Sequence, residues 1–176
     1  TYIDKNYLEG LQSYSIRSSL DMQEKILELQ PFANAIAMSA AVADFKKKSG
    51  PTTIKTNKES FIQTINEELT TTPDLLKEIV SKKTNHQIIL GFAAITGDET
   101  NIRKTGEFKR IDKGCDLLMA NPVDIPGQGF DESFNSGYLL GPNEMAKKMP
   151  FMSKLALAHQ LLDAIKVLGK QQFAKF

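Results

Sequence analysis

The chain has 176 residues, a length that predicts one domain spanning residues 1–176. It is 41% hydrophobic and 24% charged, as in globular proteins, and its 22 basic and 21 acidic residues argue against a general nucleic-acid or membrane surface. Cys115 is the only cysteine, which excludes an internal disulfide and agrees with a reducing, cytoplasmic location. The sequence contains no apolar run long enough to span a membrane and no Cys/His cluster with zinc spacing.

In the first half of the chain, short apolar or alternating segments predict strands at residues 2–3, 14–18, from Ala35 onward, and at 61–65. Residues 19–30 predict a helix that Ser19 would cap. Residues 45–58 are polar, rich in lysine and broken by a Gly-Pro turn, which predicts a mobile flap.

In the second half, apolar runs predict buried strands at residues 87–92 and 116–120 and an edge strand at 138–140. Helices are predicted after Thr72, which would cap a helix with Pro73 at its first position, and over residues 97–113. A last helix should follow a cap at Ser153 and run to Gly169. Near-continuous apolar strands that alternate with amphipathic helices predict a three-layer, Rossmann-like α/β fold with a mostly parallel sheet.

A candidate ligand site follows the strand that begins at Ala35. Small residues, among them Ser39 and Ala40, follow the strand and would let a ligand approach the backbone. Asp44 comes next, and residues 46–48, which are all lysine, follow it. Ligands of open α/β sheets bind beyond the carboxyl ends of the strands, and a carboxylate beside lysines suits a phosphate ligand with a divalent ion. A buried strand followed by a solvated loop explains the same residues equally well.

Three further features fit either a phosphate site or an ordinary fold. Lys109 and Lys113 share one helix face, where a bound polyanion would relieve their repulsion and where a solvated basic face is the alternative. The N–H groups at the helix start, residues 73–76, would either bind an anion or serve only in capping the helix. Phe92 would either face a nucleotide base or fill the core. No G-x-x-x-x-G-K-[ST] or G-x-G-x-x-G motif occurs, so phosphate binding would use strand ends and lysines.

Four stretches resemble signatures of one family and occur in the family's order. They are residues 38–45 (MSAAVADF, similar to SAAVADY), 72–76 (TPDLL, similar to NPDIL), 91–96 (GFAAIT, similar to GFAAET) and 109–121 (KRIDKGCDLLMAN, similar to K-x-x-x-K-x-x-D-L-I-x-A-N). The family is phosphopantothenoylcysteine synthetase (phosphopantothenate–cysteine ligase), usually the C-terminal half of a bifunctional coenzyme A biosynthesis flavoprotein. Together the four stretches make the resemblance specific over roughly residues 36–140.

The resemblance implies a ligase that joins 4′-phosphopantothenate to cysteine through an acyl-nucleotidylate formed from CTP. It implies Mg²⁺ as cofactor, a homodimer, and FMN bound only by a partner decarboxylase domain. The nucleotide-binding residues that it implies are Met38, Ser39, Ala40, Asp44, Pro73, Asp74, Leu75, Leu76, Phe92, Lys109 and Lys113.

The sequence departs from the family in three places. Thr53 stands where the family's flap motif K-I-K-K has its catalytic lysine, so Lys55, Lys58 or one of the lysines at 46–48 would have to substitute, and Lys55 is the candidate catalytic residue. Ile95 and Pro122 replace the usual Glu and Asp. The family's Gly-rich first strand and its N-x-S-S-G motif have no counterpart, which predicts an unfilled strand position. An upstream segment would occupy it, or a strand from a second copy or a partner.

Two other classes of function remain open at this stage. A non-catalytic nucleotide-binding or assembly module of the same fold would agree with the altered flap. A dinucleotide- or flavin-binding Rossmann protein would share the architecture, but the missing glycine fingerprint counts against it.

Overall fold

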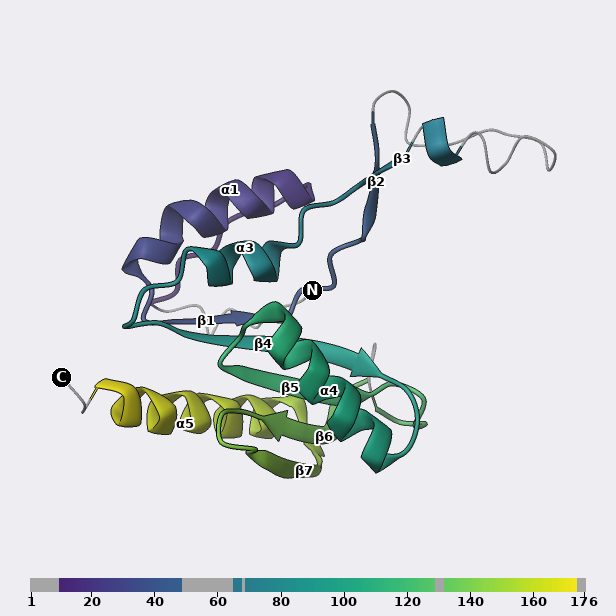
Figure 1. The fold of residues 1–176 in the computed structure, drawn as a ribbon, viewed down its shortest axis with the longest axis vertical. Coiled ribbons are helices and arrows are strands. Elements are labelled where there is room, and N and C mark those ends of the chain that lie inside the picture. The colour runs from purple at the N-terminus through teal and green to yellow at the C-terminus, as the bar shows by residue number, and fades with distance from the viewer. Residues whose placement is uncertain (1–9, 49–64, 68, 129–131, 174–176) are drawn as a thin grey trace.

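A five-stranded sheet lies at the centre of the computed structural model, which describes residues 10–48, 65–67, 69–128 and 132–173 (Figure 1). In spatial order, the strands are β1 (Ala35–Met38), β4 (Ile88–Ile95), β5 (Leu117–Pro122), β6 (Phe134–Leu140) and β7 (Ala146–Ser153). The β1, β4 and β5 strands are parallel, whereas β6 runs antiparallel to both β5 and β7. Four of these five strands therefore point in one direction, which confirms the mostly parallel sheet.

Helices cover both faces of the sheet. On one face lie α1 (Ser19–Leu29), α3 (Leu75–Ser81) and α4 (Glu99–Lys113), and α5 (Lys154–Phe173) covers the other (Figure 1). A short 3₁₀ helix, η2 (Gln30–Phe32), follows α1, and a two-stranded hairpin of β2 (Phe45–Lys47) and β3 (Leu69–Thr71) projects from the body. The three-layer α/β prediction is confirmed. Among the described residues no helix combines the length and apolar character needed to cross a membrane.

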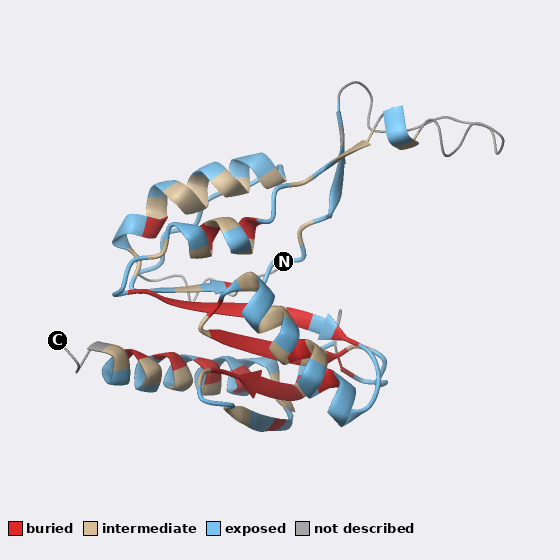
Figure 2. Ribbon diagram, viewed as in Figure 1, coloured by how far each residue is buried: buried red, intermediate tan, exposed pale blue. Residues whose placement is uncertain are grey.

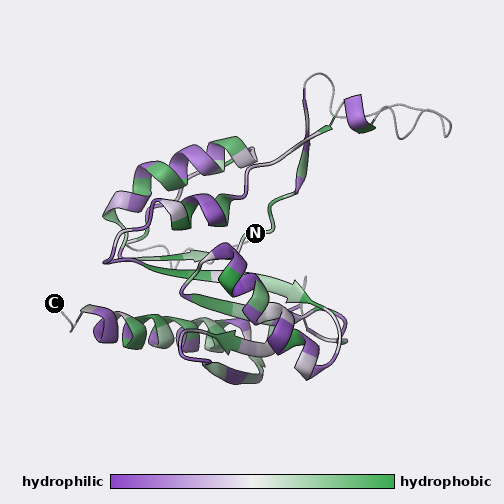
Figure 3. Cartoon of the chain, viewed as in Figure 1, coloured by the Kyte–Doolittle hydropathy of each residue, from purple (hydrophilic) through white to green (hydrophobic). Residues whose placement is uncertain are grey.

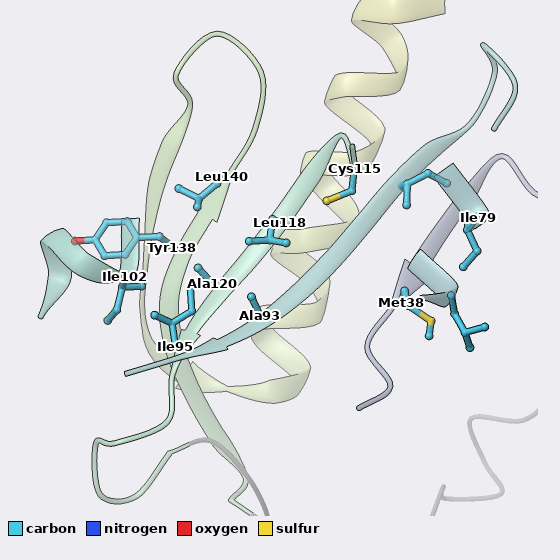
Figure 4. Packing of buried hydrophobic residues seen from close by; sticks show 12 residues of the cluster. Met38, Ile79, Ala93, Ile95, Ile102, Cys115, Leu118, Ala120, Tyr138 and Leu140 are labelled. Carbon is cyan, nitrogen blue, oxygen red and sulfur yellow. The ribbon is translucent and has the colours of Figure 1, made fainter. Parts of the chain in front are cut away.

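The core consists of two apolar clusters, one on each face of the sheet. Neighbouring residues of one strand belong to different clusters, as Ile89 and Leu90 of β4 do, because side chains alternate across a strand. The first cluster includes Leu118 of β5 and Ile79 of α3 (Figure 4), and the second packs against α5. Hydropathy is high along β4 (Figure 3), and burial is greatest on β4, β5 and β6 (Figure 2). These central strands are therefore the rigid platform of the fold.

Local sequence signals set the ends of the helices. The side chains of Ser18, Asp74 and Asp98 each accept a hydrogen bond from a backbone N–H in the first turn of α1, α3 and α4. Gly114 ends α4 in the left-handed conformation, with φ 73°. Caps of this kind stabilise a helix by about 1 kcal/mol each.

Two contacts hold the central strands in register. The carboxylate of Asp116 accepts a hydrogen bond from the backbone N–H of Ile89 at 2.7 Å and pairs with Lys83, which ties β5 to the start of β4. At Gly137 in β6, where φ is +142° and the β6–β7 ladder shifts register, an added Cβ would lie 2.1 Å from the carbonyl oxygen of Ala120. Only glycine fits this approach of β6 to β5.

Most predicted elements are confirmed, including the strands from Ala35 and over residues 87–92 and 116–120. The cap of the last helix is also confirmed, since Ser153 Oγ accepts from the Ala156 N–H at 3.2 Å, although α5 continues to Phe173. Two cap predictions are wrong by one or two residues. Ser18 rather than Ser19 caps α1, and Asp74 rather than Thr72 caps α3, because in each case the residue immediately before the helix holds the extended conformation of a cap.

Three strand predictions differ from the structure. Residues 14–18 are not a strand but an exposed, irregular segment that pairs with no described strand. Residues 138–140 belong to β6, which lies inside the sheet rather than at its edge because β7, not predicted, pairs with it. Of the predicted strand at 61–65 only Ile65 is described, and it lies in a helical turn; residues 2–3 lie outside the described part.

The β1 strand forms one edge of the sheet. Among the described residues it pairs with β4 alone, through Ala35 to Met38. The additional strand that the family resemblance implies stays a prediction, and the free edge of β1 is where such a strand would pair.

Candidate functional site

A cavity of about 670 Å³ opens over the carboxyl ends of β1 and β4, on the face covered by α3 and α4. We call it the first cavity. Its wall includes all of the nucleotide-binding residues expected from the sequence except Ser39, namely Met38, Ala40, Asp44, Pro73, Asp74, Leu75, Leu76, Phe92, Lys109 and Lys113. These residues come from four separate parts of the chain, and the parallel order of the strands brings them to one edge of the sheet.

Lys109 and Lys113 lie one turn apart on the wall that α4 contributes to the first cavity. Lys113 forms an ion pair with Asp74 at 2.5 Å, whereas Lys109 has no ion-pair partner among the described residues. A third lysine, Lys77, pairs with Asp112 at 2.9 Å on the same rim. Lys109 is therefore free to meet an anion, and Lys113 would exchange one carboxylate for another anion.

Asp74 has two roles in this arrangement. Its side chain caps α3 by accepting from the Lys77 N–H at 3.2 Å, and it also holds Lys113. Partial burial alone would raise the pKa of Asp74, but the hydrogen bonds from Lys113 and from the Lys77 N–H outweigh burial and lower that pKa. The start of α3 therefore presents a carboxylate to the first cavity, which weighs against the phosphate contact expected from free N–H groups at residues 73–76.

One aromatic ring, that of Phe108 in α4, lies on the wall of the first cavity and is 71% exposed. Phe92 of β4 also lines this cavity, but its half-buried side chain packs with the apolar cluster on the α5 face of the sheet. Sequence reasoning identified Phe92 but missed Phe108, together with Asp112. The missed pair could have been found from their helical spacing, because residues 108 and 112 are one turn apart and directly precede the two lysines. The cavity thus combines cations with one ring face that a nucleotide base could stack on.

The carboxylates of the first cavity suit a metal that arrives with its ligand. Asp44, Asp74 and Asp112 line the cavity, but the described residues contain no group of three His, Cys, Asp or Glu side chains close enough to hold a metal ion. Mg²⁺ bound to a triphosphate needs only one or two protein carboxylates. Asp44 fits this role because its position is fixed. Its backbone carbonyl accepts from the Thr72 N–H at 2.8 Å, which ties the loop after β1 to the segment before α3.

A second cavity, of about 550 Å³, lies on the α5 face of the same strand ends. It shares with the first cavity the residues Ala40, Ala41, Phe92, Ala93 and Ala94. The rest of its wall is Ser39, Asn121, Val123, Asn135, Lys154, Leu157, Ala158 and Leu161. Ser39, expected at the nucleotide, therefore lies in the second cavity. Asn121 was not singled out from the sequence, although a polar residue at the end of a buried strand is a recognisable signal.

The candidate catalytic residue lies outside the described residues. Lys55 and most of the predicted flap, residues 49–58, are not described. The described beginning of that segment is β2, which pairs with β3 from Phe45 to Lys47. The flap prediction and the assignment of Lys55 stay predictions.

The sequence of the chain matches a known protein family. A family profile described as "DNA/pantothenate metabolism flavoprotein C-terminal domain" matches residues 3–168. The coenzyme A biosynthesis bifunctional protein CoaBC of Bacillus subtilis (strain 168) is 35% identical over 167 residues, which cover 93% of this chain and 39% of the relative. The protein of the same name from Mycobacterium tuberculosis (strain ATCC 25618 / H37Rv) is 32% identical, with 89% and 38% covered. The chain thus spans about two fifths of these relatives.

Solved structures show the same fold. The C-terminal domain of a CoaBC protein superposes with a TM-score of 0.68 at 22% identity, covering 90% of this chain and 68% of that one. A Cab2 variant in complex with phosphopantothenate-cysteine gives a TM-score of 0.62 at 14% identity, with 96% and 56% covered. At these identities the structural match establishes the architecture alone.

Proposed function

The chain belongs to the DNA/pantothenate metabolism flavoprotein C-terminal domain family, and on that premise we propose that it is a CTP-dependent phosphopantothenate–cysteine ligase of coenzyme A biosynthesis. The names of its relatives support the pathway, since they are coenzyme A biosynthesis proteins. The bound molecule named for the Cab2 structure, phosphopantothenate-cysteine, is the product that such a ligase would release.

The proposed reaction has two steps. A carboxylate oxygen of 4′-phosphopantothenate attacks the α-phosphorus of CTP, an O–P bond forms, and the bond from the α-phosphorus to the bridging oxygen breaks to release pyrophosphate. The amine of cysteine then attacks the acyl carbon, a C–N bond forms, the C–O bond to CMP breaks, and one amine proton leaves. Both steps need charge neutralisation and the positioning of weak nucleophiles.

The residues of the first cavity support the first step. Lys109 binds the triphosphate, and Lys113 joins it by exchanging Asp74 for a phosphate oxygen. Phe108 provides a face for the base. Asp44 would hold the Mg²⁺ that travels with the nucleotide, and that ion would offset phosphate charge.

The observation that carries this proposal is the assembly of the first cavity. Motifs at residues 38–45, 72–76, 91–96 and 109–121 are distant in the sequence, yet residues of all four line one cavity at the carboxyl edge of the sheet. Residues that serve only the core or the solvent have no reason to meet in this way. The match between motif and cavity is what favours nucleotide chemistry.

Product formation tests the proposal. The purified chain is incubated with Mg²⁺, CTP, 4′-phosphopantothenate and cysteine, and the amide and pyrophosphate are followed by mass spectrometry and a coupled assay. We expect both products in equal amounts and none without CTP. Parallel titrations with CTP, ATP, NAD and FMN assign the ligand class, and sedimentation tests the homodimer that we propose with the ligase.

Each outcome has a distinct meaning. Binding of CTP without amide formation would contradict the ligase and favour a non-catalytic nucleotide-binding module. Binding of NAD or FMN in preference to CTP would favour a dinucleotide or flavin protein. We propose that FMN belongs to the partner decarboxylase domain, so this chain should not bind it.

A further inference from the structure

The first cavity carries more negative than positive side chains. The described residues on its wall include three aspartates, Asp44, Asp74 and Asp112, and two lysines, Lys109 and Lys113. Like charges in a partly exposed cavity repel one another over several ångströms. An excess of carboxylates on the wall therefore weakens the binding of an anionic ligand unless a cation near the wall offsets it.

Asp112 is the carboxylate that needs such a cation. Asp74 forms an ion pair with Lys113 at 2.5 Å, and Asp44 is the carboxylate that would meet the Mg²⁺ of a nucleotide. Asp112 lies three positions after Lys109 on α4, and side chains three apart on a helix are neighbours that can form an ion pair. Left to itself, Asp112 would both repel an anion and occupy Lys109.

Lys77 of α3 holds Asp112 instead. Its Nζ lies 2.9 Å from Oδ1 of Asp112, across the contact between α3 and α4 (Figure 1). Lys77 is not itself part of the wall of the first cavity. Within the described part of the chain Lys109 has no ion-pair partner, although an aspartate lies one turn away. The pair of Lys77 and Asp112 thus accounts for the free ammonium group of Lys109.

We propose that Lys77 is a positioning residue for the nucleotide. It neutralises Asp112 and keeps that carboxylate away from Lys109, so that Lys109 stays available for a phosphate. This inference rests on the proposed nucleotide-binding function and adds to it a residue from outside the four motifs, since Lys77 directly follows the stretch at residues 72–76. Lys77 acts through Asp112 and does not touch the nucleotide.

The exposure of the pair separates its effect on binding from its effect on stability. The side chains of Lys77 and Asp112 are 46% and 44% exposed. Water and salt screen charges at such positions, so the pair contributes little to folding stability. A triphosphate carries several negative charges, and each of them interacts with Asp112. The loss of Lys77 should therefore change nucleotide affinity much more than it changes thermal unfolding.

A purely structural role of the pair predicts a different pattern. If the pair only ties α3 to α4, removing either partner breaks the same tie, and both replacements change affinity in the same direction. If Lys77 shields the nucleotide from Asp112, the two replacements act in opposite directions. Loss of Lys77 exposes a carboxylate, whereas loss of the carboxylate leaves a surplus cation.

Calorimetric titration of CTP·Mg²⁺ separates these roles. Wild type, Lys77→Met, Asp112→Asn and the double variant are titrated at about 0.01 M and about 0.1 M salt, where the screening length is roughly 30 Å and 10 Å. Methionine keeps an unbranched side chain without the charge. Lys82→Met is the matched control, because Lys82 directly follows α3 and pairs with Glu78 at 3.2 Å without lining the first cavity. Thermal unfolding of every variant verifies that the fold is intact.

At the lower salt concentration we expect Lys77→Met to weaken CTP·Mg²⁺ binding about three- to tenfold and Asp112→Asn to strengthen it by about the same factor. The double variant, which lacks both charges, should bind within about twofold of wild type. All of these changes should shrink at the higher salt concentration. Lys82→Met should bind as wild type.

Two kinds of result would overturn the inference, and they are distinguishable. If the wild-type chain binds CTP·Mg²⁺ but both single replacements weaken binding, or Lys77→Met leaves it unchanged, the role of Lys77 is wrong while the proposed function stands. If the wild-type chain does not bind CTP·Mg²⁺, the proposed function fails and this inference fails with it.

Discussion

The edge strand β1 and the centre of the sheet differ in how firmly they are built. At the edge, β1 has four residues, pairs with a single described strand, and leaves Ala35 and Ala37 exposed. In the centre, β5 and β6 are buried along most of their length and are held by the bulge at Gly137. Both cavities open where the less buried edge meets the rigid centre. The comparison teaches that stability and binding are separable in this fold, and it can be tested by substitutions in each region.

Gly137→Ala should have the largest effect on stability. The new Cβ would lie 2.1 Å from a backbone oxygen that cannot move without breaking β5, and the residue would keep a φ of +142°. We expect a loss of roughly 3–5 kcal/mol in the free energy of unfolding, measured with denaturant. Gly127→Ala is the matched control, because Gly127 also has positive φ but has open space around it. Equal losses in the two variants would show that backbone strain alone, not the close approach of β6 to β5, requires Gly137.

A pair of truncations compares the centre with the β1 edge directly. Leu139 in β6 is 0% exposed, so Leu139→Ala should cost about 2–5 kcal/mol through lost burial and the cavity left behind. Ile36 in β1 is only half-buried, and Ile36→Ala should cost roughly 1 kcal/mol. Denaturant unfolding of both variants measures the difference. Equal costs would mean that β1 is packed by residues beyond those described and that the edge and the centre are alike.

Asp74→Asn should change nucleotide affinity while leaving the stability of the fold nearly unchanged. Asparagine is as good a helix cap as aspartate, so α3 should remain intact, while Lys113 loses its ion-pair partner. We expect CTP·Mg²⁺ affinity to rise by about two- to fivefold, the size of an exposed ion pair that no longer competes. Weaker binding would mean that Asp74 itself contacts the ligand.

The effect of Asp74→Asn should be independent of pH between 6 and 8. The pKa of Asp74 is lowered in the folded chain, so its carboxylate is ionised and paired with Lys113 above its ordinary value of 3.8. Stability from the pair is lost only as pH falls through the lowered pKa. A pH-dependent difference near neutrality would show that another group controls Lys113.

The sequence predicted the centre of the molecule better than its edges. The strands around Leu90 and Leu118 are uninterrupted apolar runs, and only burial on both faces explains such runs. By contrast, β7 has two consecutive exposed lysines before the buried Met149 and contains Pro150, so its signal depends on the partner strand β6. Residues 14–18 have an alternating pattern but no described strand to pair with, which is information that a local pattern does not contain.

The same limit applies to the candidate site. The family motifs led to the residues of the first cavity, and the structure gathers them as expected. Lys154 and Asn135 belong to no motif. Lys154 reaches the second cavity because α5 folds back over the sheet, and Asn135 reaches it because β6 pairs with β5. The ion pair between Asp74 and Lys113 could not be predicted from the sequence either, since 39 positions separate the two residues.

The central claim is that Lys109 binds the nucleotide in the first cavity, and calorimetric titration of CTP·Mg²⁺ tests it most directly. Lys109→Ala is compared with wild type and with Lys104→Ala, a lysine on the same helix that lines no part of the first cavity. We predict that Lys109→Ala weakens binding by roughly 1.5–3 kcal/mol, with unchanged thermal unfolding, and that Lys104→Ala binds as wild type. Equal affinity in all three proteins would contradict the claim and remove the nucleotide from this cavity.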